Sequence, residues 1–141
     1  MSQIVVVNYD SIGLIDVLSV LGAAGYQASG ASTFAGAKRA LTRGQGGVPD
    51  LVIADERLGA YNGLHVIMRA REEYPDVSAI VMTTVKNHGL EADAKCLNVQ
   101  CLITPQSPAE WLEPIWKILN AERIEGRPST AGDPDSPVSR I

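Results

Sequence analysis

Hydrophobic residues are grouped along this chain into short continuous runs. Three runs are strongly apolar, at Ile4–Val7, Leu51–Ala54 and Ala79–Met82. Continuous apolar runs, rather than alternating ones, are typical of strands that are covered on both faces of a parallel sheet. Two weaker runs, Tyr26–Ala28 and Cys101–Ile103, complete a set of five predicted strands.

Helical spacing of apolar residues fills the intervals between these runs. Gly25 is placed to end the first predicted helix, and Pro75 stops the third. Ser107, Pro108 and Glu110 form a capping-box pattern at the start of the last helix, although Pro114 inside it predicts a kink or a restart. The predicted apolar stripes are Leu14/Val17/Leu18/Leu21, Phe34/Ala37/Leu41, Leu64/Ile67/Met68/Arg71, Leu90/Ala94/Leu97 and Trp111/Ile115/Ile118.

Strand and helix therefore alternate five times. This order predicts an α/β domain, doubly wound, with a parallel five-stranded sheet and helices on both faces. We expect the domain to cover residues 1–120. The remaining segment, 121–141, is rich in Pro, Ser and Asp and is expected to be a flexible tail or the start of a linker.

Composition narrows the function. The net charge of −4 and the pI of about 5.1 give no basic surface for nucleic acid and no polybasic patch for a membrane. No secretory signal and no apolar run of membrane-spanning length is present, so we expect a cytoplasmic protein. Cys96 and Cys101 lack zinc-ligand spacing, and we expect two reduced, partly buried thiols.

Candidate chemistry is expected where the predicted strands end, because ligands of open α/β sheets collect beyond the carboxyl ends of the strands. These positions hold Asn8-Tyr9-Asp10, Asp55-Glu56-Arg57, Thr83-Thr84, Thr104-Pro105 and the loop after the second strand. Asp55 is the strongest candidate among them, because a carboxylate at the end of an apolar run gains nothing from core packing. Two simpler roles stay open: Asp55 as a helix cap or a solvated strand end, and Asp10 as a cap of the first helix together with Ser11.

Over about residues 3–120 the chain resembles the receiver domain of response regulators in two-component signalling. The resemblance rests on Pro49–Asp55, on the eight-residue spacing from Asp55 to Gly63, on Thr83-Thr84, and on Thr104-Pro105. It implies a flavodoxin-like (βα)5 fold with strand order 2-1-3-4-5. It further implies that Asp55 is the phospho-acceptor and that Thr83 and Thr104 contact the phosphoryl group.

Several family positions are altered. The family's first two acids after strand one are Asn8 and Tyr9 here, which leaves Asp10, Asp55 and the backbone carbonyl of Arg57 as a weak Mg²⁺ ligand set. The family's lysine is Thr104, a hydroxyl without charge. The aromatic switch residue on the last strand is Cys101, which is smaller.

The resemblance therefore implies a non-enzymatic signalling module whose aspartyl phosphorylation is impaired or absent. Its partner is expected to be a protein, a histidine kinase or an output protein, bound by the fourth helix, the fifth strand and the fifth helix. A conventional phospho-receiver, modified on Asp55 by a histidine kinase with Mg²⁺, is the alternative. A small enzyme or nucleotide binder is disfavoured because no glycine-rich loop follows the first strand.

Overall fold

The computed structural model describes residues 2–41, 48–58, 61–105 and 107–125 of the 141-residue chain. Strand and helix alternate along it, except for one short hairpin after the third strand. The strands are β1 (Gln3–Val7), β2 (Gln27–Ala31), β3 (Leu51–Asp55), β4 (Arg57–Leu58), β5 (Tyr61–Asn62), β6 (Ser78–Thr83) and β7 (Gln100–Ile103). The helices are α1 (Ser11–Ala23), α2 (Phe34–Ala40), α3 (Gly63–Glu73), α4 (His88–Cys96) and α5 (Pro108–Glu125).

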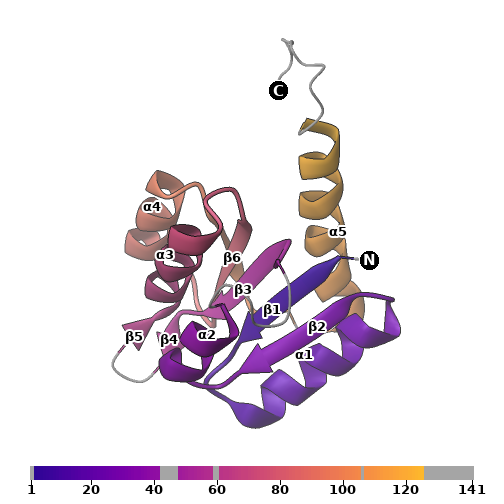
Figure 1. Cartoon of the computed structure of the whole chain (residues 1–141). Helices are drawn as coiled ribbons and strands as arrows, with labels where there is room; N and C mark the ends of the chain where they lie inside the picture. The colour runs from indigo at the N-terminus through magenta and orange to yellow at the C-terminus, as the bar shows by residue number, and fades with distance from the viewer. Residues whose placement is uncertain (1, 42–47, 59–60, 106, 126–141) are drawn as a thin grey trace.

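The main sheet has five parallel strands in the order β2-β1-β3-β6-β7. Counted among the parallel strands alone, this is the predicted order 2-1-3-4-5, and the predicted fold class is confirmed. Figure 1 shows α1 and α5 on one side of the sheet and α2, α3 and α4 on the other. The antiparallel hairpin β4–β5 was not predicted from the sequence.

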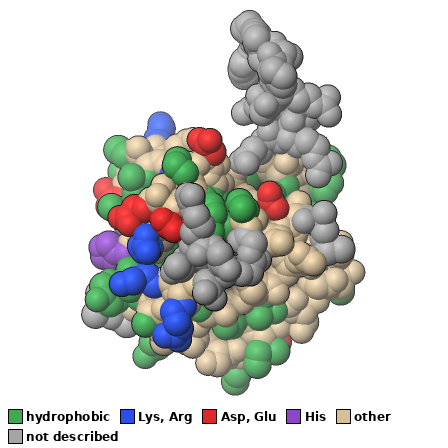
Figure 2. Space-filling view, in the orientation of Figure 1, with side chains coloured by type: hydrophobic (Ala, Val, Ile, Leu, Met, Phe, Trp, Pro, Cys, Tyr) green, Lys and Arg blue, Asp and Glu red, His purple; other side chains and the backbone are tan. Residues whose placement is uncertain are grey.

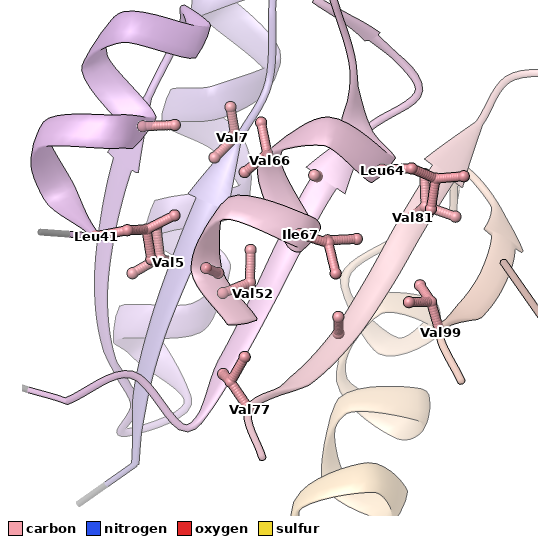
Figure 3. Packing of buried hydrophobic residues seen from close by; sticks show 14 of the residues in the cluster. Val5, Val7, Leu41, Val52, Leu64, Val66, Ile67, Val77, Val81 and Val99 are labelled. Atoms are coloured by element: carbon pink, nitrogen blue, oxygen red, sulfur yellow. The ribbon is translucent and has the colours of Figure 1, made fainter. Parts of the chain in front are cut away.

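The core consists of two layers, one on each face of the sheet. Alternate residues of each central strand point to opposite faces, so Val5 and Val7 belong to one layer while Ile4 and Val6 belong to the other. Figure 3 shows the layer that α2, α3 and α4 cover, where Val52 of β3 and Ile67 of α3 belong to one cluster. Residues that face either side of the sheet must be apolar, which explains why the apolar runs of the central strands are continuous.

Helix ends follow the signals in the sequence. Gly25 has a φ of 96° just after α1, a left-handed conformation that favours glycine. Thr33 caps α2 by accepting a hydrogen bond from the Gly36 amide at 2.9 Å. Pro108 begins α5 as predicted, but the helix runs through Pro114 without ending there.

The structure corrects other details. Met68 was placed in the buried stripe of α3 but is 49% exposed, and Arg71 of that stripe bonds to carbonyl oxygens instead. Helix α5 continues to Glu125, past the predicted domain end at 120, and the rest of the predicted tail, 126–141, lies outside the described residues. The sequence also predicts that Gly44 ends the second helix, and this residue lies outside the described ranges. None of the described helices is both long and apolar enough to cross a membrane.

Candidate functional site

The predicted site residues gather at the carboxyl edge of the sheet. Strand register pairs Ala54 with Val7 on one side and Asp55 with Met82 on the other, so the ends of β1, β3 and β6 are level. Thr83 in turn pairs with Ile103 of β7, directly before Thr104. Asp55, Thr83 and Thr104 therefore mark the ends of three adjacent strands, and Asn8 to Asp10 follow the end of β1.

Asp55 ends β3 and is partly buried. Burial raises the pKa of its carboxyl group above the ordinary value, and the negative charge of Glu56 adds to this effect. The backbone N–H groups of Glu56 and Arg57, and the charge of Arg57, lower the pKa without cancelling the rise. The folded chain therefore disfavours the ionised form of the Asp55 carboxyl group relative to an exposed one.

The backbone around Asp55 is fixed by a close approach of α3. A Cβ atom placed on Gly63 would lie 2.5 Å from the Asp55 carbonyl oxygen and 3.1 Å from the Ala54 Cβ. Glycine is therefore required where α3 begins against the end of β3. Asn62 and His65 complete this start as a reciprocal capping box, with bonds of 3.2 Å and 3.1 Å between side chain and backbone amide.

Glu56 joins two loops at this edge. Its Oε1 accepts a hydrogen bond of 2.7 Å from the Thr83 hydroxyl, and its Oε2 accepts one of 3.0 Å from the Asn87 side-chain amide. Thr83 is 1% exposed and is the sole buried polar residue among the described ranges. We call these three residues the Glu56 network. Sequence reasoning placed Glu56 at a strand end but gave it no role, because the pairing depends on which loops meet in space.

The loop after β1 has a different organisation. The Asn8 Oδ1 accepts a bond of 3.0 Å from the Asp10 amide, and the Asp10 Oδ1 accepts one of 3.1 Å from the Ile12 amide. Asp10 is the N-cap of α1, so the simpler role foreseen for it is confirmed. Tyr9 is 63% exposed.

The residues present fit Mg²⁺ poorly. Across the described part of the chain, no three His, Cys, Asp or Glu side chains lie close enough together to hold a metal ion. Of the predicted ligands, Asp10 already uses one carboxylate oxygen as a helix cap, and the other two are the Asp55 carboxylate and the Arg57 backbone carbonyl. A hard cation needs several carboxylate or carbonyl oxygens in one place. We therefore assign no chemical step to a metal here.

Thr104 closes the site on the β7 side. Its backbone amide and its hydroxyl both donate to the Thr83 carbonyl oxygen, at 2.8 Å and 3.2 Å. The two cysteines are free thiols, as predicted, but Cys96 is exposed rather than partly buried. Burial raises the pKa of the Cys101 thiol, with smaller contributions from the charges of Glu91 and Glu56.

Comparisons by sequence and by structure give different results. No family model and no curated protein matches the sequence. Solved structures match well: a CheY-like response regulator receiver domain protein from Methanospirillum hungatei JF-1 has a TM-score of 0.80 at 20% identity, covering 89% of this chain and 99% of that one. A response regulator receiver protein from Sinorhizobium medicae WSM419 has a TM-score of 0.74 at 25% identity, covering 85% and 95%.

A response regulator from Thermotoga maritima is similar at a TM-score of 0.73 and 25% identity, covering 85% of this chain and 98% of that one. The chain has the receiver fold. In that fold, the carboxyl edge described above is the place where open α/β sheets collect their chemistry. The three neighbours are each covered almost completely, at 99%, 95% and 98% of their own length.

Proposed function

We propose that this receiver-fold domain is a signalling module that binds a protein partner and whose aspartyl phosphorylation is impaired. The observation that carries the proposal is Thr104, a neutral side chain where the receiver family has a lysine. Its hydroxyl is bonded to the backbone of Thr83. Phosphoryl transfer depends on positioned positive charge. One cationic contact stabilises the transition state by about 3 kcal/mol.

The loop after β1 supports the same proposal. Asn8 stands where the family has an acid, and the oxygen of its side chain already accepts the Asp10 amide. Asp10 itself caps α1. Because fewer carboxylates are available at this edge, Mg²⁺ binding is weakened. With it is weakened the neutralisation of charge between Asp55 and an incoming phosphoryl group.

The wider role is inferred from the solved neighbours, whose descriptions name response regulators and receiver domains. We infer that this chain serves two-component signalling as a cytoplasmic, non-catalytic domain. On the side of the molecule where Figure 1 draws α2, α3 and α4, Figure 2 shows Lys and Arg side chains beside Asp and Glu side chains. This mixture of charges suits a protein partner better than a nucleic acid.

The proposed partner surface consists of α4, β7 and α5. Strand β7 is an edge strand of the sheet, and its last residue, Ile103, is 55% exposed. Trp116 of α5 is 59% exposed, whereas Trp111 of the same helix is buried in the core. Exposed tryptophan is a frequent anchor of protein interfaces. A histidine kinase or an output protein is the expected partner.

One observation favours the conventional alternative, in which Asp55 accepts phosphate from a histidine kinase with Mg²⁺. Asp55 is partly buried at the carboxyl edge, and backbone N–H groups of Glu56 and Arg57 face its carboxylate. The two functions differ in whether this edge can bind a phosphoryl group.

The test is a titration of the ¹⁵N-labelled full chain with beryllofluoride and Mg²⁺, followed by amide NMR. Beryllofluoride mimics an aspartyl phosphate, so binding requires Asp55, the metal and the surrounding charge together. We expect no saturating shifts at Asp55, Thr83 or Thr104. Saturating shifts in the wild type that Asp55→Asn abolishes would establish the conventional function instead.

A rescue experiment sharpens this test. Asn8→Asp combined with Thr104→Lys restores one of the two acids and the cation that the family has, and we expect this double variant to bind beryllofluoride with Mg²⁺. Asn8→Asp combined with Thr84→Lys is the matched control. Thr84 is the exposed neighbour of Thr83, and its replacement by lysine adds the same charge at a different place. Equal behaviour of the two double variants would mean that Thr104 is not the deciding position.

A further inference from the structure

Glu56 lies in the connection between β3 and β4, and its backbone is held on both sides. Its amide donates to the Met82 carbonyl at 2.7 Å, and its carbonyl accepts from the Gly63 amide at 3.1 Å. The backbone is thus tied to β6 on one side and to the start of α3 on the other. A side chain on so fixed a base loses less entropy when it forms further bonds.

The two carboxylate oxygens of Glu56 reach across to the end of β6 and to the loop between β6 and α4. One accepts the Thr83 hydroxyl and the other accepts the Asn87 amide. Asn87 is also the N-cap of α4, since its Oδ1 accepts the Leu90 amide at 3.0 Å. The orientation of the capping side chain is therefore set by Glu56.

The Thr83 hydroxyl has two acceptors but one proton. Besides Glu56, the Val85 carbonyl oxygen lies 2.9 Å from it. A hydroxyl donates one full hydrogen bond at a time, and a bond to a charged acceptor is about twice as strong as a bond to a neutral one. The negative charge of Glu56 therefore decides which acceptor Thr83 prefers.

We propose that the Glu56 carboxylate is a built-in anion that positions the start of α4 through Thr83 and Asn87. Helix α4 belongs to the partner surface proposed above, so the inference rests on that proposed function and extends it. The anion is part of the chain, and the arrangement of α4 therefore requires no phosphoryl group on Asp55. Glu56 is a positioning residue that acts on the partner surface from outside it.

The experiment compares amide hydrogen exchange and chemical shifts of the full chain without phosphate, metal or beryllofluoride. Glu56→Gln keeps the shape but removes the charge and turns an N–H group toward Asn87 or Thr83. We expect exchange of the Leu90 amide to become about five- to tenfold faster, as for a loss of roughly 1 kcal/mol. Shifts should appear at Val85, Lys86 and Asn87.

Glu113→Gln is the matched control, because Glu113 makes an exposed pair with Lys117 on α5. It should leave the Leu90 amide unchanged. Thr83→Val should reproduce part of the effect of Glu56→Gln, because the bond from Asn87 to Glu56 remains. Thr83→Ser should keep wild-type exchange because it retains the hydroxyl, and the double variant Glu56→Gln/Thr83→Val should show less than the sum of the two single effects.

Wild-type exchange at Leu90 in Glu56→Gln, or fully additive effects in the double variant, would overturn the proposal. Either result would leave the proposed function standing, because the experiment involves no phosphoryl group. Conversely, beryllofluoride binding by the wild type would refute impaired phosphorylation without changing the exchange results.

Discussion

At each end of the sheet a charged side chain holds neighbouring segments together, and the sign of its charge differs between the two ends. At the amino end, the Arg71 guanidinium of α3 donates to the Val77, Leu97 and Asn98 carbonyl oxygens, which precede β6 and β7. At the carboxyl end, the Glu56 carboxylate accepts from the side chains of Thr83, at the end of β6, and Asn87, just before α4. A cation is therefore matched to backbone acceptors at one end, and an anion to side-chain donors at the other.

The difference concerns what can change at each end. The guanidinium group stays charged at all relevant pH values and its acceptors are backbone atoms, so the amino end has one stable arrangement. At the carboxyl end two neighbouring carboxylates, Asp55 and Glu56, repel each other, and the Thr83 hydroxyl has a choice of two acceptors. We infer that the amino end serves stability and that the carboxyl end can respond to charge.

The largest expected effect is at the amino end. Arg71→Ala removes the donors of three carbonyl oxygens, two of them in partly buried bonds, and should lower the free energy of unfolding by about 3 kcal/mol. Arg71→Lys should lower the free energy of unfolding by more than half of that amount, because one ammonium group cannot reach all three acceptors. Urea unfolding followed by circular dichroism measures both changes.

Arg69→Ala is the control for that experiment. Arg69 lies on the same helix and pairs with Glu72 at 3.0 Å, with side-chain exposures of 28% and 68%. An exposed pair of this kind contributes less than about 1 kcal/mol. If Arg71→Ala also shifted the amide signals of Glu56 and Asn87, the two ends would be coupled and the comparison would fail.

The second effect concerns the backbone of the carboxyl end. Gly63→Ala places a Cβ atom 2.5 Å from the Asp55 carbonyl oxygen, and the resulting displacement should cost about 2 kcal/mol in unfolding free energy. Gly22→Ala on α1 is the control, because no atom lies within 4 Å of its added Cβ, and it should stabilise the helix by about 0.5 kcal/mol. Equal effects of the two substitutions would show that α3 can move away from Asp55.

The central strands could be predicted from the sequence because their signal is local. Ile4 to Val7 must be apolar at every position since both faces of β1 are covered, and that pattern is visible without neighbours. The strand ends were equally visible, so Asp55 and Thr83 were placed correctly at the carboxyl edge. The exposed edge strand β2 gave a weaker signal, and its predicted length was too short.

The pairings at the site could not be predicted in the same way. Glu56 and Asn87 are 31 positions apart, and their contact depends on the register between β3 and β6. Arg71 occupied an apolar position of the helical pattern, and only the fold reveals that its long side chain ends on three carbonyl groups. Local periodicity identifies faces and ends, whereas the choice of hydrogen-bond partners is decided by tertiary structure.

The smallest expected effect tests the charge cost at Asp55. Because burial raises the pKa of this carboxyl group, the folded state binds its proton more tightly than the unfolded chain does. The free energy of unfolding therefore decreases as pH rises from the ordinary carboxylate pKa to the raised value in the folded state. Above that interval the full cost is present.

Asp55→Asn removes this titration and the cost. The variant should melt higher than the wild type at neutral pH, by roughly 1 to 3 °C, and the difference should narrow on acidification toward the ordinary carboxylate pKa, about pH 4. Thermal melts at several pH values measure this, with Asp16→Asn on the exposed face of α1 as the matched control. A wild type that melts higher than Asp55→Asn at neutral pH would mean that the Asp55 carboxylate is stabilised by its surroundings. In that case the carboxyl end would be no more responsive to charge than the amino end.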